Sequence, residues 1–375
     1  MADKKVEKEL QPLRDRIREL DGQIIELINA RAGVVIEVGA IKARENAEVF
    51  HPRQEKEVYK RIEAMNGGPL PSSVLRAIYR EIMSGCIALE KKLLIAYLGP
   101  AATFTHQAAL ARFGASVEYV PVHTIGDVFS EVENGHADYG VVPIENSTEG
   151  AVNSTLDMLS HSTLKICSEI RHEISHCLIS NEPKAKIKRV YSKSEAIGQC
   201  NHWLRTNLPT VELVEVSSTA VAAERAAGEP GAAAVASELA AKMYTLEIIE
   251  RSIEDVHHNE TRFLVIGKQD SPPSGDDKTS LMFSTKDRVG ALHEVLGILR
   301  ECGINLSMIE SRPSSQKAWE YYFFADFDGH ITDPAVEKAI TRLETQCKLV
   351  KILGSYPKSF EATKATPPPR LDGGG

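Results

Sequence analysis

Apolar residues recur at intervals of three and four along the first part of the chain, and this pattern constrains the fold more than any other feature. The positions are Leu13, Ile17, Leu20, Ile24, Leu27, Ile28, Val35, Val38 and Ile41. They predict one amphipathic helix that has Pro12 in its first turn and continues to about Arg44. At 1.5 Å per residue this helix would be roughly 50 Å long, which a lone domain of about 90 residues cannot cover. Two shorter helices follow, separated by NGGPLP at residues 66–71. We therefore expect an all-α dimer that interlocks its long helices.

The remainder of the chain changes to strand patterns. Residues 92–267 alternate short β-rich runs, such as LLIAYL, YGVVPI and RFLVIG, with helical stretches such as THQAALARF. This rhythm predicts α/β sheets covered by helices. From SLMFSTK onwards the expected order is strand, helix, strand, strand, helix, strand. That order is the α+β, ferredoxin-like split unit.

Breaks in composition set the expected domain boundaries. KQDSPPSGDDK is rich in Pro, Ser, Gly and Asp, and the end of the chain carries PPP and GGG. The first segment predicts a linker and the second a disordered tail. A chain of 375 residues with 42% hydrophobic residues can bury more than one core. We expect domains at residues 1–91 and 92–268, a linker at 269–278, a domain at 279–356 and a disordered tail at 357–375.

Charge and cysteine usage exclude several classes of function. The formal net charge of -8 argues against a nucleic acid or an anionic membrane as a partner. The six cysteines are scattered singly without the spacing of a zinc site, which favours reduced thiols and no metal. The charged N-terminus lacks the apolar core of a signal peptide, and no run reaches the roughly 18 apolar residues of a membrane span. We expect a soluble, cytoplasmic protein without a cofactor.

The first helix offers three cations that a small anion could meet. Arg31 and Lys42 are eleven residues apart, which places them within roughly 20° of each other on one face. Arg14 is turned away by about 100° and would serve another site, such as that of a partner chain. Basic residues on a long helix are also often simply solvated, and position alone does not decide between these interpretations.

The segments LRDRIRELD, NARAGVVIEVGAIK and REIMSGCIALE resemble the AroQ-type chorismate mutases, which are intertwined all-α dimers. The resemblance implies that Arg14, Arg31 and Lys42 bind the two carboxylates and the ether oxygen of chorismate, with Arg14 reaching across the dimer. It implies further substrate contacts from Glu55, Cys86 and Glu90. Such a rearrangement of a dianion needs only a compact conformer and well-placed cations, and Arg clamps a carboxylate with two hydrogen bonds.

Two positions depart from the mutase pattern. Gln54 follows Arg53 in FHPRQEKEV, where relatives usually carry Arg followed by Glu after the proline, and Glu90 stands where some relatives carry Gln. A Glu must be protonated to donate a hydrogen bond to the ether oxygen of the substrate. The resemblance therefore implies that Arg31, Lys42 and Glu90 carry catalysis, at a rate that rises toward acid pH.

The middle segment resembles prephenate dehydratase through GPAATFTHQAA, DYGVVPIENSTEGAVNSTLDML, the QC of EAIGQC, VSSTAVAAE and NETRFLVIG. The resemblance implies two α/β lobes, much like a type II periplasmic binding protein, with the active site in the cleft between them. Strand ends of such sheets are where ligands bind. It implies that Thr261 and Arg262 are central to catalysis, with Phe263 packed behind them and also close to the substrate. The implied lining of the cleft is Glu145, Asn146, Ser147, Thr148 and Gln199.

The dehydratase reaction expels a ring hydroxyl while carbon dioxide departs, so the enzyme must assist a poor leaving group. Thr261 can donate a hydrogen bond to that hydroxyl, but it is too weak an acid to be a comfortable sole source of the proton. Glu145, if partly desolvated, would have a raised pKa and is the second candidate donor. Arg262 could hold a substrate carboxylate or an internal acid, and both remain open. Ala102 stands where the family usually has Gly, which adopts a positive φ at least cost.

The last segment resembles the ACT domains that are fused to these dehydratases. Residues matching the two phenylalanine-binding motifs are Gly290, Ala291 and Leu292, and Glu310, Ser311, Arg312 and Pro313. The resemblance implies that L-phenylalanine binds as an effector between two paired copies of the domain. A different affinity for two states of the protein would then shift the dehydratase cleft.

Together the resemblances imply a bifunctional chorismate mutase and prephenate dehydratase, feedback-inhibited by L-phenylalanine and assembled as a homodimer or a higher homo-oligomer. Three alternatives remain open. The helical domain could be a scaffold for a dehydratase-only enzyme, which His51 and Gln54 favour. The dehydratase could prefer arogenate over prephenate. The chain could also be a non-catalytic amino-acid sensor, although the intact Thr-Arg-Phe triplet argues against this.

Overall fold

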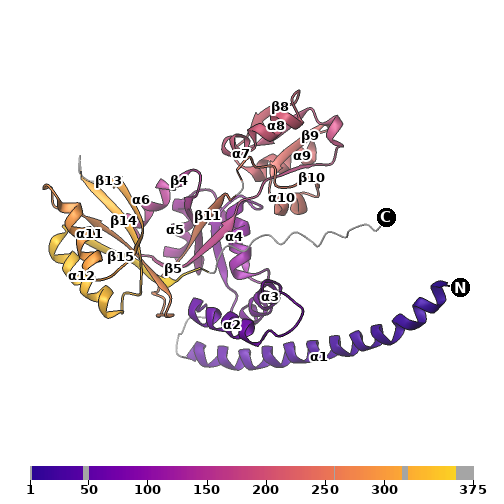
Figure 1. The fold of residues 1–375 in the computed structure, drawn as a ribbon, viewed down its shortest axis with the longest axis horizontal. Coiled ribbons are helices and arrows are strands. Elements are labelled where there is room, and N and C mark those ends of the chain that lie inside the picture. The colour runs from indigo at the N-terminus through magenta and orange to yellow at the C-terminus, as the bar shows by residue number, and fades with distance from the viewer. Residues whose placement is uncertain (1, 45–49, 257, 315–319, 360–375) are drawn as a thin grey trace.

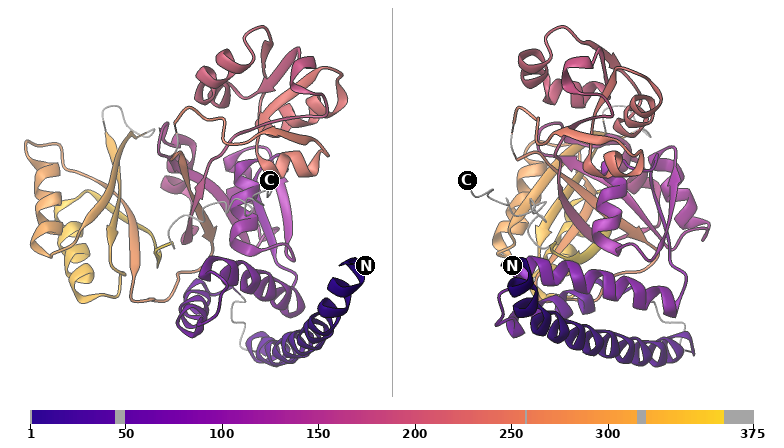
Figure 2. Two further views of the ribbon diagram at one scale, coloured as in Figure 1. Left: turned by 45° about the vertical axis from the view of Figure 1, so that its right-hand side comes forward. Right: turned by 90° about the vertical axis from the view of Figure 1, so that its right-hand side faces the viewer.

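The computed structural model describes residues 2–44, 50–256, 258–314 and 320–359. Its elements form a helical unit, a two-lobed α/β unit and a C-terminal α+β unit, in that order along the chain (Figure 1). The first lobe of the α/β unit packs against both other units, and the second lobe projects away from them (Figures 1 and 2). This three-part layout is the one expected from the sequence.

The helical unit contains α1 (Ala2–Arg44), α2 (Pro52–Met65) and α3 (Ser72–Glu90). The C-terminal part of α1 lies beside α2 and α3, whereas its N-terminal part extends away from the rest of the chain (Figure 1). Because α1 begins at Ala2, Pro12 lies inside the helix, and the expectation of a first-turn proline was wrong. Pro12 removes one helical hydrogen bond, but the residues before it are mostly good helix formers and continue the helix.

The first lobe of the α/β unit is a sheet in the order β2-β1-β3-β11-β5, with β4 paired to β3. Its strands are β1 (Leu94–Leu98), β2 (Glu118–Val122), β3 (Tyr139–Asn146), β4 (Gly150–Ala151), β5 (Lys165–Glu173) and β11 (Glu260–Gly267). Its helices are α4 (Phe104–Phe113), α5 (Ile125–Glu133) and α6 (Asn153–His161). The late strand β11 is antiparallel to both neighbours, β3 and β5. The chain therefore enters the second lobe after β5 and returns through β11, which forms a hinge of two segments.

The second lobe is a sheet in the order β10-β6-β9-β7-β8. Its strands are β6 (Cys177–Ser180), β7 (Arg189–Ser192), β8 (Glu212–Glu215), β9 (Ala232–Ala236) and β10 (Glu247–Glu250). Its helices are η1 (Lys184–Lys186), α7 (Ser194–Gln199), α8 (Asn201–Asn207), α9 (Thr219–Gly228) and α10 (Glu238–Met243). Alanines dominate the core between α9 and β9, and such small side chains allow the helix to lie close to the sheet.

Ala102 joins the two lobes. It adopts a φ of 68° and is fully buried in the core of the second lobe, although its loop belongs to the first. Ser237 Oγ, at the start of α10, donates a hydrogen bond to the carbonyl oxygen of Ala102 at 3.3 Å. A positive φ is costly for an alanine. This cost explains why glycine suits the position, and the buried methyl group is the packing that the alanine gains.

The C-terminal unit contains β12 (Asp277–Ser284), α11 (Ala291–Glu301), β13 (Leu306–Pro313), β14 (Tyr321–Asp328), α12 (Pro334–Gln346) and β15 (Leu349–Pro357). Its antiparallel sheet has the order β13-β14-β12-β15. Helices α11 and α12 cover one face of this sheet. The other face packs against the first lobe, where Met282 and Phe324 share a core with Leu156 and Leu264. Every residue of β12 is accordingly buried.

Several segments differ from the expectation. The strands β4, β5, β6 and β10 were not predicted, because β5 carries Lys, Glu, Arg and His within its sequence and the other three are short. The expected linker at residues 269–278 includes the start of β12, and Ser271 Oγ donates to the carbonyl oxygen of Cys167 at 2.7 Å. The expected tail from residue 357 begins as ordered chain and lies outside the described residues from 360 onwards. Over the described residues, no helix is both long and apolar enough to span a membrane, and the cysteines form no disulfide.

Candidate active sites and effector domain

A cationic cluster lies between α1 and α3. Arg31 Nη1 is 3.1 Å from the Sγ atom of Cys86, and Lys42 Nζ is 3.3 Å from Oε1 of Glu90. The side chains of Lys42 and Glu90 are only 18% and 5% exposed. A Cβ added to Gly39 would lie 2.5 Å from Cγ of Glu90, so glycine permits this close approach of α1 to α3. The structure thus brings together four of the predicted mutase residues.

Glu55 lies apart from this cluster, which departs from the expectation. Its Oε2 atom is 2.6 Å from Nη1 of Arg112, on α4 of the first lobe, and Tyr59 donates a hydrogen bond to Oε1 at 3.1 Å. Burial, followed by the charge of Glu55, raises the pKa of Tyr59. Glu55 therefore joins the helical unit to the α/β unit. Arg14 is exposed and pairs with Glu7 on its own helix.

Asn146 organises a polar network where β3 and β11 meet the second lobe. Its Nδ2 atom donates to Oγ1 of Thr261 at 2.7 Å and to Oδ1 of Asn259 at 2.8 Å. Its Oδ1 atom accepts hydrogen bonds from the backbone and hydroxyl of Thr148, at 2.9 and 2.6 Å, and from the backbone of Glu149 at 3.1 Å. Because the oxygen of Thr261 accepts from Asn146, its own proton can be donated elsewhere.

Gln199, at the end of α7, connects this network to the second lobe. Its Nε2 atom donates to Oε1 of Glu149 at 2.8 Å, and its Oε1 atom accepts from Nδ2 of Asn259 at 3.0 Å. The Nε2 atom of His176 lies 2.8 Å from the same oxygen. Burial lowers the pKa of His176, although Gln199 and Glu254 oppose the shift. A neutral imidazole and two amides therefore link the lobes at the hinge.

The strand register separates the remaining predicted residues. Asn146 is opposite Thr261, whereas Glu145 is opposite Arg262. Since alternate residues of a strand point to opposite faces, Thr261 and Arg262 project from opposite sides of β11. Glu145 shares the side of Arg262 and is half-buried. Thr261 and Glu145 therefore do not share a face.

Ser147 and Phe263 support the site from behind. Ser147 Oγ accepts a hydrogen bond from the backbone of Glu260 at 3.0 Å, and so ties the turn after β3 to the start of β11. Phe263 is 2% exposed in the core shared with Tyr97 and Val141. This packing behind Thr261 was expected, but such a buried ring is a core residue, and its expected contact with substrate is corrected.

Arg262 lies in a buried charge network between the first lobe and the C-terminal unit, which corrects its expected place in the cleft. Its Nε atom is 2.8 Å from Oε2 of Glu169, and its Nη1 atom is 2.5 Å from Oδ2 of Asp326. Its Nη2 atom donates to the hydroxyl of Tyr356 at 2.9 Å. Burial raises the pKa of Glu169, but the charges of Arg262 and Lys278 outweigh this and lower it overall. Of the two roles left open for Arg262, the structure shows the partner of an internal acid.

The predicted effector motifs lie at the start of α11 and on the edge strand β13. Gly290 precedes α11 with a φ of 81°, a conformation that glycine adopts at least cost, and Ala291 and Leu292 begin the helix. Glu310, Ser311, Arg312 and Pro313 are on β13. Arg312 Nη2 donates to both carboxylate oxygens of Asp157, at 2.9 and 2.7 Å, and its Nε atom adds a third contact at 3.2 Å. Asp157 is on α6, so this motif is attached to the first lobe.

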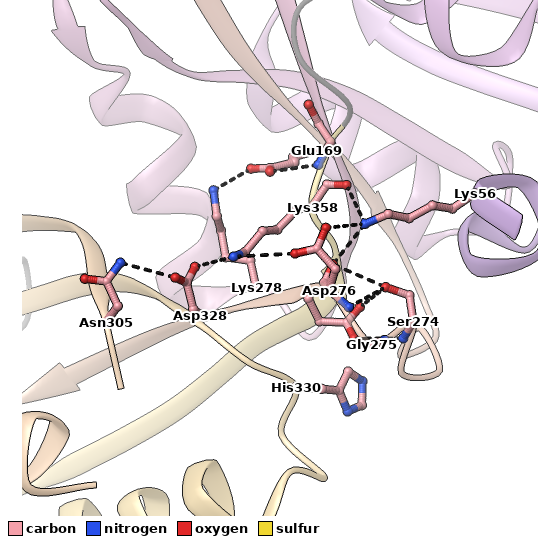
Figure 3. Close-up of polar contacts among 12 residues, drawn as sticks. Lys56, Glu169, Ser274, Gly275, Asp276, Lys278, Asn305, Asp328, His330 and Lys358 are labelled. Atoms are coloured by element: carbon pink, nitrogen blue, oxygen red, sulfur yellow. Dashed lines mark hydrogen bonds and ion pairs between the residues drawn. The ribbon is translucent and has the colours of Figure 1, made fainter. Parts of the chain in front are cut away.

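A second joint connects α2 to the C-terminal unit (Figure 3). Lys56 Nζ is 2.9 Å from Oδ2 of Asp276, which precedes β12. Lys358 follows β15, and its Nζ atom is 3.6 Å from Oδ1 of Asp276 and 2.7 Å from Oδ1 of Asp328. Asn305 Nδ2 donates to the other oxygen of Asp328 at 3.2 Å. These polar side chains therefore form a continuous series of contacts from the helical unit to Asn305, which precedes the edge strand β13 of the C-terminal sheet.

Sequence reasoning missed three polar residues around Thr261. Asn259 stands two residues before it in NETRF, directly ahead of β11, and that spacing was the available signal. His172 is in β5 and His176 is in the short segment between β5 and β6, and neither belongs to a motif. His172 is opposite Thr261 on β5, and its Nε2 atom lies 3.0 Å from Oε1 of Gln107. Burial lowers the pKa of His172 to about 4.

Comparison with known proteins agrees with this layout. The family models that match are chorismate mutase type II over residues 13–91, prephenate dehydratase over 95–271 and the ACT domain over 279–345. They define a multidomain enzyme in which two catalytic domains precede an ACT domain. The bifunctional chorismate mutase/prephenate dehydratase of Aquifex aeolicus (strain VF5) is 49% identical over 357 residues, which cover 94% of this chain and 99% of that protein. The chain belongs to the family of bifunctional chorismate mutase/prephenate dehydratases.

Two solved structures align with most of this chain. The prephenate dehydratase from Arthrobacter aurescens in complex with L-Phe is 33% identical, with a TM-score of 0.66, and covers 71% of this chain and 90% of that chain. GqqA, described as a novel type of quorum quenching acylase, is 28% identical with a TM-score of 0.66, and covers 71% and 98%. One scaffold is thus described with two different activities, so function must be argued from the site.

Proposed function

We propose that this chain converts chorismate to prephenate in its helical unit and prephenate to phenylpyruvate in the cleft of its α/β unit. The observation that carries the dehydratase assignment is the pairing of Asn146 Nδ2 with Thr261 Oγ1 at 2.7 Å. This contact orients a hydroxyl whose proton can be donated, at a site to which both lobes contribute side chains. Membership of the bifunctional family supports both activities.

In the proposed mutase step, Arg31 and Lys42 stabilise the negative charge that develops on the ether oxygen and hold a carboxylate of chorismate. They lie together and largely out of solvent, where a fixed charge interacts strongly. The substrate would displace the present contacts of Arg31 with Cys86 and of Lys42 with Glu90. No nucleophile is required, because the reaction is a rearrangement within one molecule.

We further propose that Arg14 completes the mutase site of a second copy, and that the protein is a homodimer or a higher homo-oligomer. The apolar stripe of α1 supports this arrangement, since Leu13, Ile24 and Leu27 are 59%, 52% and 70% exposed in the single chain. A row of large apolar side chains on one helix marks an interaction surface. A second α1 would cover the stripe and bring its own Arg14 close.

In the proposed dehydratase step, Thr261 donates a hydrogen bond to the departing ring hydroxyl while the carboxylate is lost as carbon dioxide. The loss of both groups yields the aromatic ring of phenylpyruvate. Glu145 remains the second candidate source of the proton, but its position on the opposite face from Thr261 favours the threonine. Asn146, Thr148 and Gln199 would orient the substrate as the lobes close, with Ser147 bracing the turn.

We also propose the finer classification of the two C-terminal parts. The pair of lobes with a two-segment hinge supports a type II periplasmic-binding-protein-like fold, and the strand order supports a ferredoxin-like fold for the ACT domain.

L-phenylalanine would bind at Gly290–Leu292 and Glu310–Pro313 and inhibit the dehydratase. The complex of the Arthrobacter aurescens enzyme with L-Phe supports this choice of effector. We propose a cytoplasmic location, in keeping with cysteines that form no disulfide in the described residues.

The decisive experiment supplies chorismate to the purified chain and follows prephenate and phenylpyruvate, with and without L-phenylalanine. Thr261→Val should abolish phenylpyruvate formation and leave chorismate consumption unchanged, whereas Thr261→Ser, which keeps the hydroxyl, should retain part of the activity. Unchanged dehydratase rates in Thr261→Val would remove the catalytic assignment. Persistence of chorismate would indicate the dehydratase-only alternative, faster turnover of arogenate would change the substrate, and binding without turnover would indicate a sensor.

A further inference from the structure

The side chains of Thr261 and Arg262 belong to two different environments although the residues are neighbours. Thr261 takes part in the polar network of the cleft, whereas Arg262 points through the opposite face of β11 toward the C-terminal sheet. Consecutive Cα atoms are 3.8 Å apart. Any displacement of the Arg262 backbone is therefore passed directly to the residue that we assign to catalysis.

The partners of Arg262 come from both domains. Glu169 is on β5 of the first lobe, whereas Asp326 and Tyr356 are on β14 and β15 of the ACT domain. Lys278, on β12, also pairs with Glu169 at 2.9 Å. The four charged side chains are at most 9% exposed, and two positive charges face two negative ones. Buried charges of this kind are tolerated only while every partner is in place, so Arg262 requires a docked ACT domain.

The hydroxyl of Tyr356 fixes the geometry of this network. It accepts from Arg262 Nη2 at 2.9 Å and lies 2.6 Å from Oγ of Ser280, which in turn donates to Asp326 at 2.5 Å. Tyr356 itself is fully buried. A shift of β14 would therefore move Asp326 and a shift of β15 would move Tyr356, and each is one of the three groups that hold the guanidinium.

The ladder between β3 and β11 is interrupted next to Thr261. The register shifts between Arg262 and Phe263, where the strand opposite carries one extra residue. A bulge interrupts the hydrogen-bonded ladder and allows the strand to bend. The bulge therefore separates the pair of Thr261 and Asn146 from the rest of this ladder. On the other side of β11 the register with β5 is regular from Glu260 to Val265, and the side chain of Arg262 adds an anchor at the residue next to Thr261.

We propose that Arg262 is a positioning residue of the dehydratase, through which the docking of the ACT domain on the first lobe sets the hydroxyl of Thr261. An effector that displaces β14 or β15 thus changes the cleft through Asp326, Tyr356 and Arg262. This inference rests on the proposed function, because it assumes that Thr261 acts in the dehydratase reaction. It assigns the Thr-Arg-Phe triplet three roles: Thr261 faces the substrate, Arg262 faces the ACT domain and Phe263 fills the core.

The test is Tyr356→Phe in the full chain, which removes one hydroxyl and keeps the ring. We expect the kcat of the dehydratase to fall about tenfold with KM for prephenate within twofold, inhibition by L-phenylalanine to weaken at least fivefold, and chorismate consumption to stay unchanged. Tyr322→Phe is the matched control, because Tyr322 is a buried tyrosine of β14 in the same interface. It should leave all of these quantities as in the wild type.

A cycle with Thr261→Ser separates positioning from a general structural effect. If Tyr356 acts through Thr261, the loss caused by Tyr356→Phe should be at least threefold smaller in the Thr261→Ser background, because distant independent substitutions combine additively. Arg262→Lys, which keeps a positive charge but cannot reach three partners, should behave like Tyr356→Phe. Wild-type kcat and inhibition in Tyr356→Phe, or full additivity with Thr261→Ser, would overturn the inference. A wild-type chain that forms no phenylpyruvate would instead refute the proposed function.

Discussion

The Nζ atom of Lys56 lies 2.9 Å from Oδ2 of Asp276, and the two residues belong to different domains (Figure 3). The same ammonium group contacts the carbonyl oxygens of Asp276 and Lys358, at 3.0 and 3.3 Å. Asp277 and Pro357 are opposite each other in the sheet formed by β12 and β15. One lysine of α2 therefore holds the place where the chain enters and leaves the ACT sheet. A movement of α2 relative to that sheet would therefore break these contacts.

Lys56→Met should lower the midpoint of the first thermal unfolding transition by roughly 3–8 °C. The side chain of Lys56 is 7% exposed, and its loss removes three polar contacts, whereas Asp276 is 53% exposed and regains water. Scanning calorimetry measures the shift. Lys60→Met, at an exposed position of the same helix, should leave the midpoint within about 1 °C, and an equal effect of both substitutions would speak against the joint.

The imidazole of His172 predicts a loss of stability in weak acid. Its folded pKa of about 4 lies below the ordinary value of 6.5, because burial disfavours the charged form. Between these values the unfolded chain binds a proton that the folded chain does not, so stability is full above pH 6.5 and falls as the pH approaches 4. From pH 7 to pH 5 this one group should cost about 2 kcal/mol. Denaturation at both pH values should show a smaller loss in His172→Gln, and parallel losses would contradict the assignment.

Asp157→Asn should weaken inhibition by L-phenylalanine at least fivefold and leave the uninhibited dehydratase rate within twofold. The amide keeps the shape of the side chain but removes the charge that holds Arg312 of the effector motif with three contacts. Helix α6 follows directly on the turn and short strand that line the cleft. Inhibition curves provide the measurement, with Asp270→Asn at an exposed site as the control. An unaltered inhibition curve would show that the Arg312–Asp157 contact does not carry the signal.

Glu90→Gln should raise the mutase rate at pH 8 by about tenfold and flatten its dependence on pH. A carboxylate cannot donate a hydrogen bond to the ether oxygen of chorismate, whereas an amide donates at any pH. The residue lies 3.3 Å from Lys42 in the cationic cluster, so the substitution also changes the local charge. Chorismate consumption between pH 5 and 8 measures both effects. A wild-type rate that is flat over this range would refute the idea that Glu90 must be protonated.

The sequence predicts most elements whose burial follows a simple period. The apolar steps of α1 and the apolar runs that became β3, β9 and β11 can be recognised within a few neighbouring residues, and the structure confirms these elements. The strand β5 could not be predicted in this way, because Glu169 and Lys165 occupy positions where an ordinary buried strand has apolar residues. Their partners, Arg262 and Ile352, come from much later in the chain. A local pattern contains no information about such distant compensation.

In the candidate sites, too, contacts within one domain could be predicted, whereas contacts between domains could not. Motif order predicted that Asn146, Thr148, Gln199 and Thr261 would meet, and the structure brings them into one network. The roles of Arg262 and Glu55 depend on how whole domains dock, since their partners are Asp326 and Arg112 in other units. Alternation along β11 does place Arg262 on the face opposite Thr261, but nothing near it in sequence tells what covers that face.

The neighbouring positions of Asp277 and Pro357 mean that the chain enters and leaves the ACT sheet at the same place. A gene fusion could append or exchange such a module without rerouting the chain through the catalytic lobes. An exchanged domain would still have to match the face of the first lobe. Without residues equivalent to Asp326 and Tyr356, the buried guanidinium of Arg262 would lose two of its partners. Which regulatory domain such an enzyme can carry is therefore limited by a few buried charges at the interface and not by the covalent connection.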